Sequence, residues 1–268
     1  MPSAGFEYLA LHAIPFALVV CRLAGTFLFA PLLAGVMLPQ RYKILLVIMA
    51  AAAIYPFTRH ALVVPSEMDV FGLLPLLVFE TLLGYCVGAI ASIPLLSLEM
   101  SGVIAGQQMG LGLARVYNPE VDVDTDLLGQ LLYYLAMGVY IAAGGVEALL
   151  GCVMDSFTSF PVGGFSPGAA PLEALIAALN SGFELAIRVS APVTGIVLLL
   201  VLLMGVIGKT MPQINIMTIG FAIKIIVGLA AVAFSAAAIR AAAGDEAADI
   251  TRSVIRWLTP DSPHLAAD

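Results

Sequence analysis

Charged side chains are scarce in this sequence. Asp, Glu, Lys and Arg together make up 11% of the 268 residues, whereas soluble domains carry about 25%. Such a chain has too little polar surface to face water on all sides, which excludes an ordinary soluble domain. The net charge of −7 also excludes a nucleic-acid-binding protein, which needs a basic patch.

Cysteine and histidine, with three residues each, are also too few and too scattered to predict a metal site or a disulfide framework. The cysteines lie far apart within apolar runs and form no CxxC pair, which indicates small buried side chains. No HExxH or paired-histidine spacing occurs, so a zinc protease is not predicted. We therefore expect no metal and no cofactor.

Two apparent catalytic or metal-binding motifs lack a part that their chemistry requires. The stretch 164–168 has the GxSxG pattern of a nucleophile elbow, but Pro167 follows the serine and has no backbone N–H for an oxyanion hole. Asp122, Asp124 and Asp126 imitate a calcium loop without its turn glycine. We interpret these aspartates as a solvated acidic loop in which Thr125 or Asp126 caps a helix that begins at Leu127. The sequence predicts no enzyme.

Apolar residues, in contrast, are abundant, at 61% of the chain. About 20 of them in a row cross a bilayer, and runs of this kind occupy most of the sequence. We predict an all-α polytopic membrane protein of six to eight kinked hydrophobic helices arranged as helical hairpins, with residues 1–240 as one helical domain and 241–268 as a polar tail. The first run has no convincing cleavage site and is expected to stay in the mature protein. The apolar runs cover residues 14–38, 44–57, 70–98, 127–154, 172–187, 189–208 and 216–239.

Ionisable residues within these runs are functional candidates, because charge is costly inside a membrane. Glu184 and Arg188 are four residues apart, so on a helix they can pair with each other. Glu80, Glu147 and Lys224 have no partner evident in the sequence. They could meet one another, a neighbouring subunit or a proton path, and all three possibilities stay open.

The glycine-rich stretch from Gly102 to Pro119 has the most unusual composition. Gly102, Gly106 and Gly110 are four residues apart, so one helical face could accept a close backbone approach. So many glycines also make a poor helix by propensity. The alternative interpretation is a pore plug, in which apolar side chains exclude ions by dewetting and glycine hinges let them move.

Three parts of the sequence resemble the FliR family of flagellar export-gate subunits, in matching order and spacing across residues 10–240. The Pro-Gln-Ile-Asn stretch is the most specific of them, and the first 45 residues look more flagellar than virulence-type. The matching segments are Arg22-Leu23-Ala24-Gly25 with Phe29 to Leu33 and Leu38 to Lys43, Gly110 to Pro119, and Met211 to Ile216 with Gly220, Phe221 and Lys224.

The resemblance implies a non-catalytic channel subunit in the bacterial inner membrane, within the flagellar basal body. With FliP-like and FliQ-like subunits it would form the gate for unfolded flagellar export substrates, and an FlhB-like switch protein would associate with it. It also implies a lumen plug formed by Gly106, Gly110, Leu111, Gly112, Leu113, Val116, Tyr117 and Pro119, and a helix break with subunit packing at Pro212, Gln213, Asn215 and Lys224. Family members often carry aromatic residues where this chain has Leu113 and Val116.

Two other classes of protein compete with a protein-export channel. A small-solute membrane transporter should show broken helices in two related halves, and no convincing internal repeat is present. An intramembrane enzyme would need a nucleophile, base or metal set, and none is intact.

Overall fold

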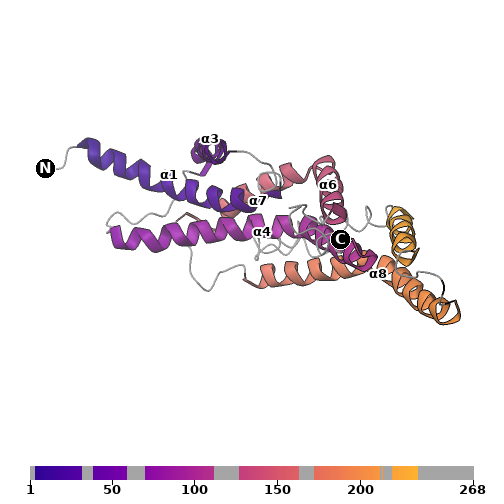
Figure 1. Cartoon of the computed structure of the whole chain (residues 1–268). Coiled ribbons are helices and arrows are strands. Elements are labelled where there is room, and N and C mark those ends of the chain that lie inside the picture. Colours follow the sequence, from indigo (N-terminus) through magenta and orange to yellow (C-terminus); the bar gives the residue numbers. More distant parts are fainter. Residues whose placement is uncertain are drawn as a thin grey trace, which may run out of the picture. The chain divides into compact units, whose positions relative to one another are not determined.

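The computed structural model describes residues 4–31, 39–58, 70–111, 127–162, 172–211, 213 and 219–234 (Figure 1). Within these ranges the chain forms seven helices, which confirms the predicted all-α class. They are α1 (Ala4–Phe29), α3 (Gln40–Thr58), α4 (Val70–Met109), α6 (Leu127–Ala142), α7 (Gly145–Ser159), α8 (Leu172–Thr210) and the helix Ile219–Phe234.

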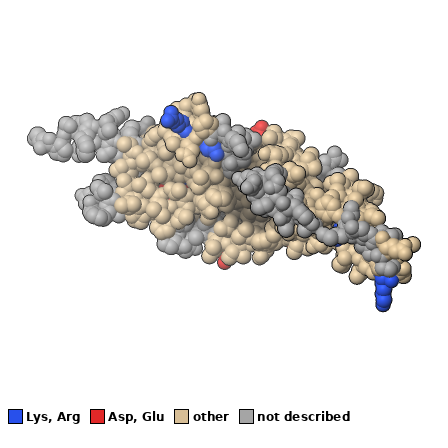
Figure 2. Space-filling view, viewed as in Figure 1, with Lys and Arg blue, Asp and Glu red and all other residues tan. Residues whose placement is uncertain are grey.

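Three of the described helices, α3, α4 and α8, are long and apolar enough to cross a membrane. The bent pair α6 and α7 gives a fourth span if its two arms are counted together. The membrane class predicted from composition is therefore confirmed. Charged side chains are sparse on the face in Figure 2, which is covered mainly by uncharged residues.

The helix boundaries differ from the apolar runs in several places, and two of these differences change how a run divides into helices. The run 127–154 is broken at Gly144, whose positive φ of 77° interrupts the helix, and α6 and α7 meet at 69°. Conversely, α8 continues without a break past Arg188 and through Pro192, where the sequence suggested two segments. Proline is tolerated in a membrane helix when its surroundings satisfy the freed backbone groups.

Helix α4 also extends further than its glycines predict. The poor helix expected from Gly102 onward is in fact regular helix as far as Met109. At Gly102 a Cβ atom would come within 2.6 Å of the Gly129 Cα and 2.7 Å of the Leu128 carbonyl oxygen in α6. Close packing against α6 thus offsets the low helix propensity of glycine.

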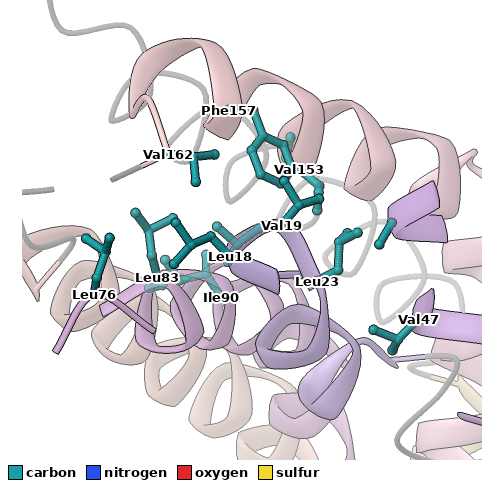
Figure 3. Close-up of a cluster of buried hydrophobic side chains, with 14 of the residues drawn as sticks. Leu18, Val19, Leu23, Val47, Leu76, Leu83, Ile90, Val153, Phe157 and Val162 are labelled. Atoms are coloured by element: carbon teal, nitrogen blue, oxygen red, sulfur yellow. The ribbon is translucent and has the colours of Figure 1, made fainter. Parts of the chain in front are cut away.

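The chain folds into two compact units, each assembled from separate stretches of sequence. The first comprises residues 1–93, 144–179 and 248–268. Its core joins side chains from α1, α3, α4 and α7 with the start of α8 (Figure 3). Fully buried members include Leu18 and Leu23 of α1, Leu83 and Ile90 of α4, and Phe157 of α7.

The second unit comprises residues 94–143 and 180–247. Leu98 of α4 lies in one apolar cluster with Ala136 of α6, and Met109 lies in another with Leu128. Because later residues of α4 meet earlier residues of α6, the two helices run antiparallel. They form a helical hairpin of the predicted kind, and α8 contributes to both clusters.

Candidate functional site: a buried ion pair and the end of helix α4

A fully buried ion pair lies within the first unit. Arg22 of α1 and Glu80 of α4 are both 0% exposed, and 2.6 Å separates the Arg22 Nε from the Glu80 Oε2. The two residues are 58 positions apart in the sequence. A buried charge is tolerated only when it is paired and hydrogen-bonded, so each of these residues requires the other.

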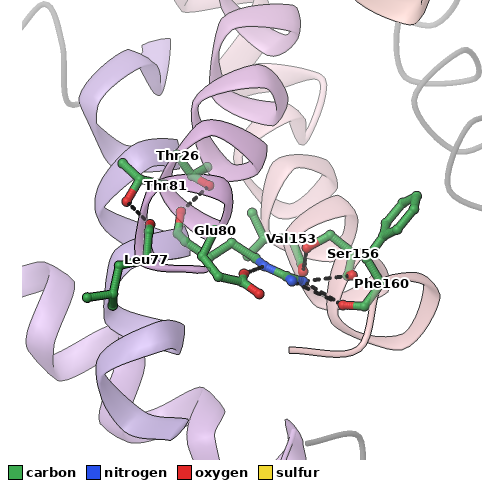
Figure 4. A network of polar contacts seen from close by, with 8 residues as sticks. Thr26, Leu77, Glu80, Thr81, Val153, Ser156 and Phe160 are labelled. Carbon is green, nitrogen blue, oxygen red and sulfur yellow. Dashed lines mark hydrogen bonds and ion pairs between the residues drawn. The ribbon is translucent and has the colours of Figure 1, made fainter. Parts of the chain in front are cut away.

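The remaining Arg22 donors join a third helix to the pair. The Arg22 Nη1 donates to the Ser156 carbonyl oxygen at 2.8 Å and to the Phe160 carbonyl oxygen at 3.1 Å, and Nη2 donates to Phe160 at 3.0 Å. The guanidinium carbon lies 4.5 Å from the centroid of the Phe157 ring. These carbonyls are at the C-terminal end of α7, where a positive charge is favourable. Arg22 therefore caps α7 from a neighbouring helix. Figure 4 labels Glu80 and the two residues, Ser156 and Phe160, whose carbonyl oxygens accept these hydrogen bonds.

Glycines bring α1 and α4 close enough for this ion pair to form. A Cβ atom at Gly84 would overlap the Arg22 carbonyl oxygen, and one at Gly88 would overlap that of Thr26. The earlier glycine meets the earlier residue of α1, and the later glycine meets the later one. The two helices α1 and α4 therefore run parallel. The backbone contact holds Arg22 directly beside the α4 turn that carries Glu80.

Sequence reasoning named Glu80 but missed Arg22 as its partner. Two signals were available: Arg22 is a charge inside an apolar run, and it belongs to the Arg-Leu-Ala-Gly stretch that resembles FliR. The α7 carbonyls could not have been identified, because Ser156 is 134 positions away and offers only its backbone.

In the second unit, the end of α4 has the hydrogen bonds of a Schellman motif. The Leu111 N–H donates to the Gly106 carbonyl oxygen and the Gly110 N–H donates to that of Gln107, both at 3.0 Å. Gly110 has a φ of 85°, a left-handed conformation that favours glycine. Gly110 is thus the point at which the helix stops.

Side chains on both sides of Gly110 are anchored in the core. Leu111 packs against the apolar cluster that contains Met109 and Leu128. Met109 is fully buried, and its side chain occupies the space beside Gly228, where a Cβ atom would lie 2.6–2.7 Å from three Met109 atoms. The chain therefore leaves α4 from a fixed position.

Some of the predicted plug and helix-break residues lie within the described ranges. Gly106 lies in the last turns of α4, with its nearest potential Cβ contact at 3.6 Å, and Gly110 and Leu111 form the helix end. Gln213 lies in an exposed turn, and Lys224 is half-buried in the helix Ile219–Phe234. The other predicted residues lie outside the described ranges: Gly112, Leu113, Val116, Tyr117, Pro119, Pro212 and Asn215.

The remaining charge candidates lie on exposed surfaces. Glu147 is in the first turn of α7, where a carboxylate is favoured by the helix dipole. Glu184 accepts a hydrogen bond from Arg188 on the surface of α8, so the predicted pairing of these two residues is confirmed. Within the described ranges, no group of His, Cys, Asp and Glu could hold a metal ion.

Comparison with known proteins shows that the chain is similar to bacterial export proteins. Residues 13–249 match the family model described as bacterial export proteins, family 1. The flagellar biosynthetic protein FliR of Buchnera aphidicola is 29% identical over 208 residues, which cover 78% of this chain and 80% of that protein. FliR of Bacillus subtilis is 28% identical over 216 residues, with 79% and 82% coverage. The Yop proteins translocation protein T of Yersinia pestis is 26% identical over 220 residues, with 79% and 81% coverage.

Proposed function

Because this chain belongs to family 1 of the bacterial export proteins, which includes FliR, we propose that it is the FliR-type subunit of a flagellar export gate. It is a membrane-embedded component of a type III secretion export apparatus, and its family consists of structural export components. The family match over residues 13–249 carries the proposal. The relatives' names favour protein export over a small-solute transporter.

The dimensions of the two longest helices support assembly with other subunits. At about 1.5 Å per residue, the 40 residues of α4 and the 39 residues of α8 each have a length along the helix of roughly 60 Å, twice the hydrocarbon thickness of about 30 Å. Large apolar side chains are exposed along both helices, from Leu74 to Met100 and from Leu172 to Val206. Lipid cannot cover all of this surface, so FliP-like and FliQ-like subunits are its proposed partners. An FlhB-like protein would join the assembly.

The lumen plug is proposed for Gly106 at the end of α4 and the segment that follows it, with Gly110, Leu111, Gly112, Leu113, Val116, Tyr117 and Pro119. Support comes from the residues on either side of 112–126, which lie close together. Met109 and Leu128 share one apolar cluster, and Gly102 and Gly129 are in near backbone contact. The segment therefore leaves and re-enters the helical hairpin at one place, as a plug fixed at its base requires. Unfolded flagellar proteins are the proposed cargo of the gate.

Deletion of Leu111 to Val116 tests the plug. The proposal predicts that the assembled gate then leaks ions, because the apolar seal is lost, and the measurement is membrane conductance of cells that carry the variant. A deletion of equal length in the polar tail after residue 241 is the control and should not leak. Intact-level conductance in a correctly assembled deletion variant would show that these residues are not the seal.

A further inference from the structure

The exposed pair Glu184 and Arg188 lies on an otherwise apolar part of α8. The two side chains are 68% and 66% exposed, and Phe183 and Ile187 beside them are 53% and 64% exposed. On the opposite side of this helix, Leu185 and Val189 are buried against α4 and α6. The charged pair therefore points away from the chain's own core, toward whatever covers α8.

Lipid would leave the charged groups of this surface short of hydrogen-bond partners, and water would leave its apolar side chains exposed. Arginine has five N–H donors, and among the described residues Arg188 uses one of them on Glu184. The other donors would remain unsatisfied in hydrocarbon, which is costly even for a paired charge. Water would satisfy them but would leave Phe183 and Ile187 exposed next to them. A protein surface that is both apolar and charged satisfies the two requirements together.

We infer that the face of α8 formed by Phe183, Glu184, Ile187 and Arg188 docks a helix of a partner membrane subunit. That helix carries a basic side chain opposite Glu184 and an acidic one opposite Arg188, within an apolar surface. The inference rests on the proposed export-gate assembly and assigns one of its contact surfaces. The charge order along α8 would select the register of the partner, because like charges in apposition are strongly unfavourable.

An order-inverting double variant separates docking from local pairing. The E184R/R188E chain keeps an i,i+4 ion pair on α8, with only a small loss from the reversed order, but presents inverted charges to a partner. The tagged full-length variant is purified from its native host in mild detergent. The amount of export subunits that co-purifies with it should be about tenfold lower, or lower still, than with the wild-type chain. Wild-type recovery by the inverted variant would overturn the inference.

A crosslinking measurement covers the case in which the inverted chain fails to insert. A photoactivatable amino acid replaces Ile187 in the otherwise wild-type chain, and mass spectrometry identifies the attached peptide. Attachment to a charged helix of a co-assembled membrane subunit supports the inference, whereas attachment to lipid alone overturns it. If no export subunits co-purify even with the wild-type chain, the proposed export-gate function is wrong. If they co-purify equally with the wild-type and the inverted chain, only the docking inference is wrong.

Discussion

At the scale of single residues, Arg22 connects three helices of the first unit. It forms an ion pair with Glu80 of α4 and donates three hydrogen bonds to carbonyls at the end of α7, all from a fully buried position in α1. One side chain thus holds three helices that are distant in sequence. Its removal would leave Glu80 buried without its charge partner and would remove the cap from α7.

Replacement of Arg22 by Gln should destabilise the isolated chain by about 3–5 kcal/mol, the usual cost of breaking a buried ion pair. Arg188→Gln is the matched control, because that pair is exposed and an exposed pair contributes about 0–1 kcal/mol. Thermal unfolding in detergent, followed by circular dichroism, measures both changes. Equal effects of the two variants would show that burial of Arg22 does not determine its contribution.

At the scale of helices, glycines have different roles that sequence spacing alone does not separate. Gly84 permits backbone contact between α1 and α4, Gly102 does so between α4 and α6, and Gly110 supplies a left-handed C-cap. Gly138 has no atom within 4 Å of its potential Cβ. Of the three regularly spaced glycines, Gly102 lies at a helix crossing and Gly110 at a helix end, whereas Gly106 between them has only ordinary contacts.

The crossing of α1 and α4 should respond to one added methyl group at Gly84. Because that methyl would overlap the Arg22 carbonyl oxygen, Gly84→Ala should force the helices apart and destabilise the chain by about 1–3 kcal/mol. Gly138→Ala should be neutral or stabilise it by up to about 1 kcal/mol, because alanine favours helix. Thermal unfolding of both variants measures these changes. Wild-type stability of the Gly84→Ala variant would contradict the close crossing of α1 and α4.

The end of α4 should depend on Gly110 and not on Gly106. Alanine at position 110 would have to adopt a positive φ, at a cost of about 1–2 kcal/mol, whereas alanine at 106 fits with ordinary contacts. Hydrogen exchange of the Leu111 amide, which donates to Gly106, should accelerate in Gly110→Ala only. Similar acceleration in Gly106→Ala would show that the Schellman motif does not control this end.

At the scale of the whole molecule, the sequence predicted the class, the start of α6 at Leu127 and the pairing of Glu184 with Arg188. It did not predict the break between α6 and α7, the length of α8 or the contacts of Arg22. Scarce charge and long apolar runs suffice for an all-α membrane protein, and three matching segments carry the resemblance to the family, the Pro-Gln-Ile-Asn stretch being the most specific of them. The continuity of α8 past Arg188 and Pro192 was not predictable, because local propensity cannot show what covers a helix. The partners of Arg22 were missed because they come from distant helices and are partly backbone atoms.

Purification in mild detergent from the native host tests whether this chain assembles with other export subunits. The tagged chain is isolated, and mass spectrometry identifies and quantifies the proteins that accompany it. We expect FliP-like and FliQ-like subunits in a fixed ratio to one copy of this chain. Recovery of the chain alone, as a stable homo-oligomer, would contradict the export-gate function and favour a small-solute transporter.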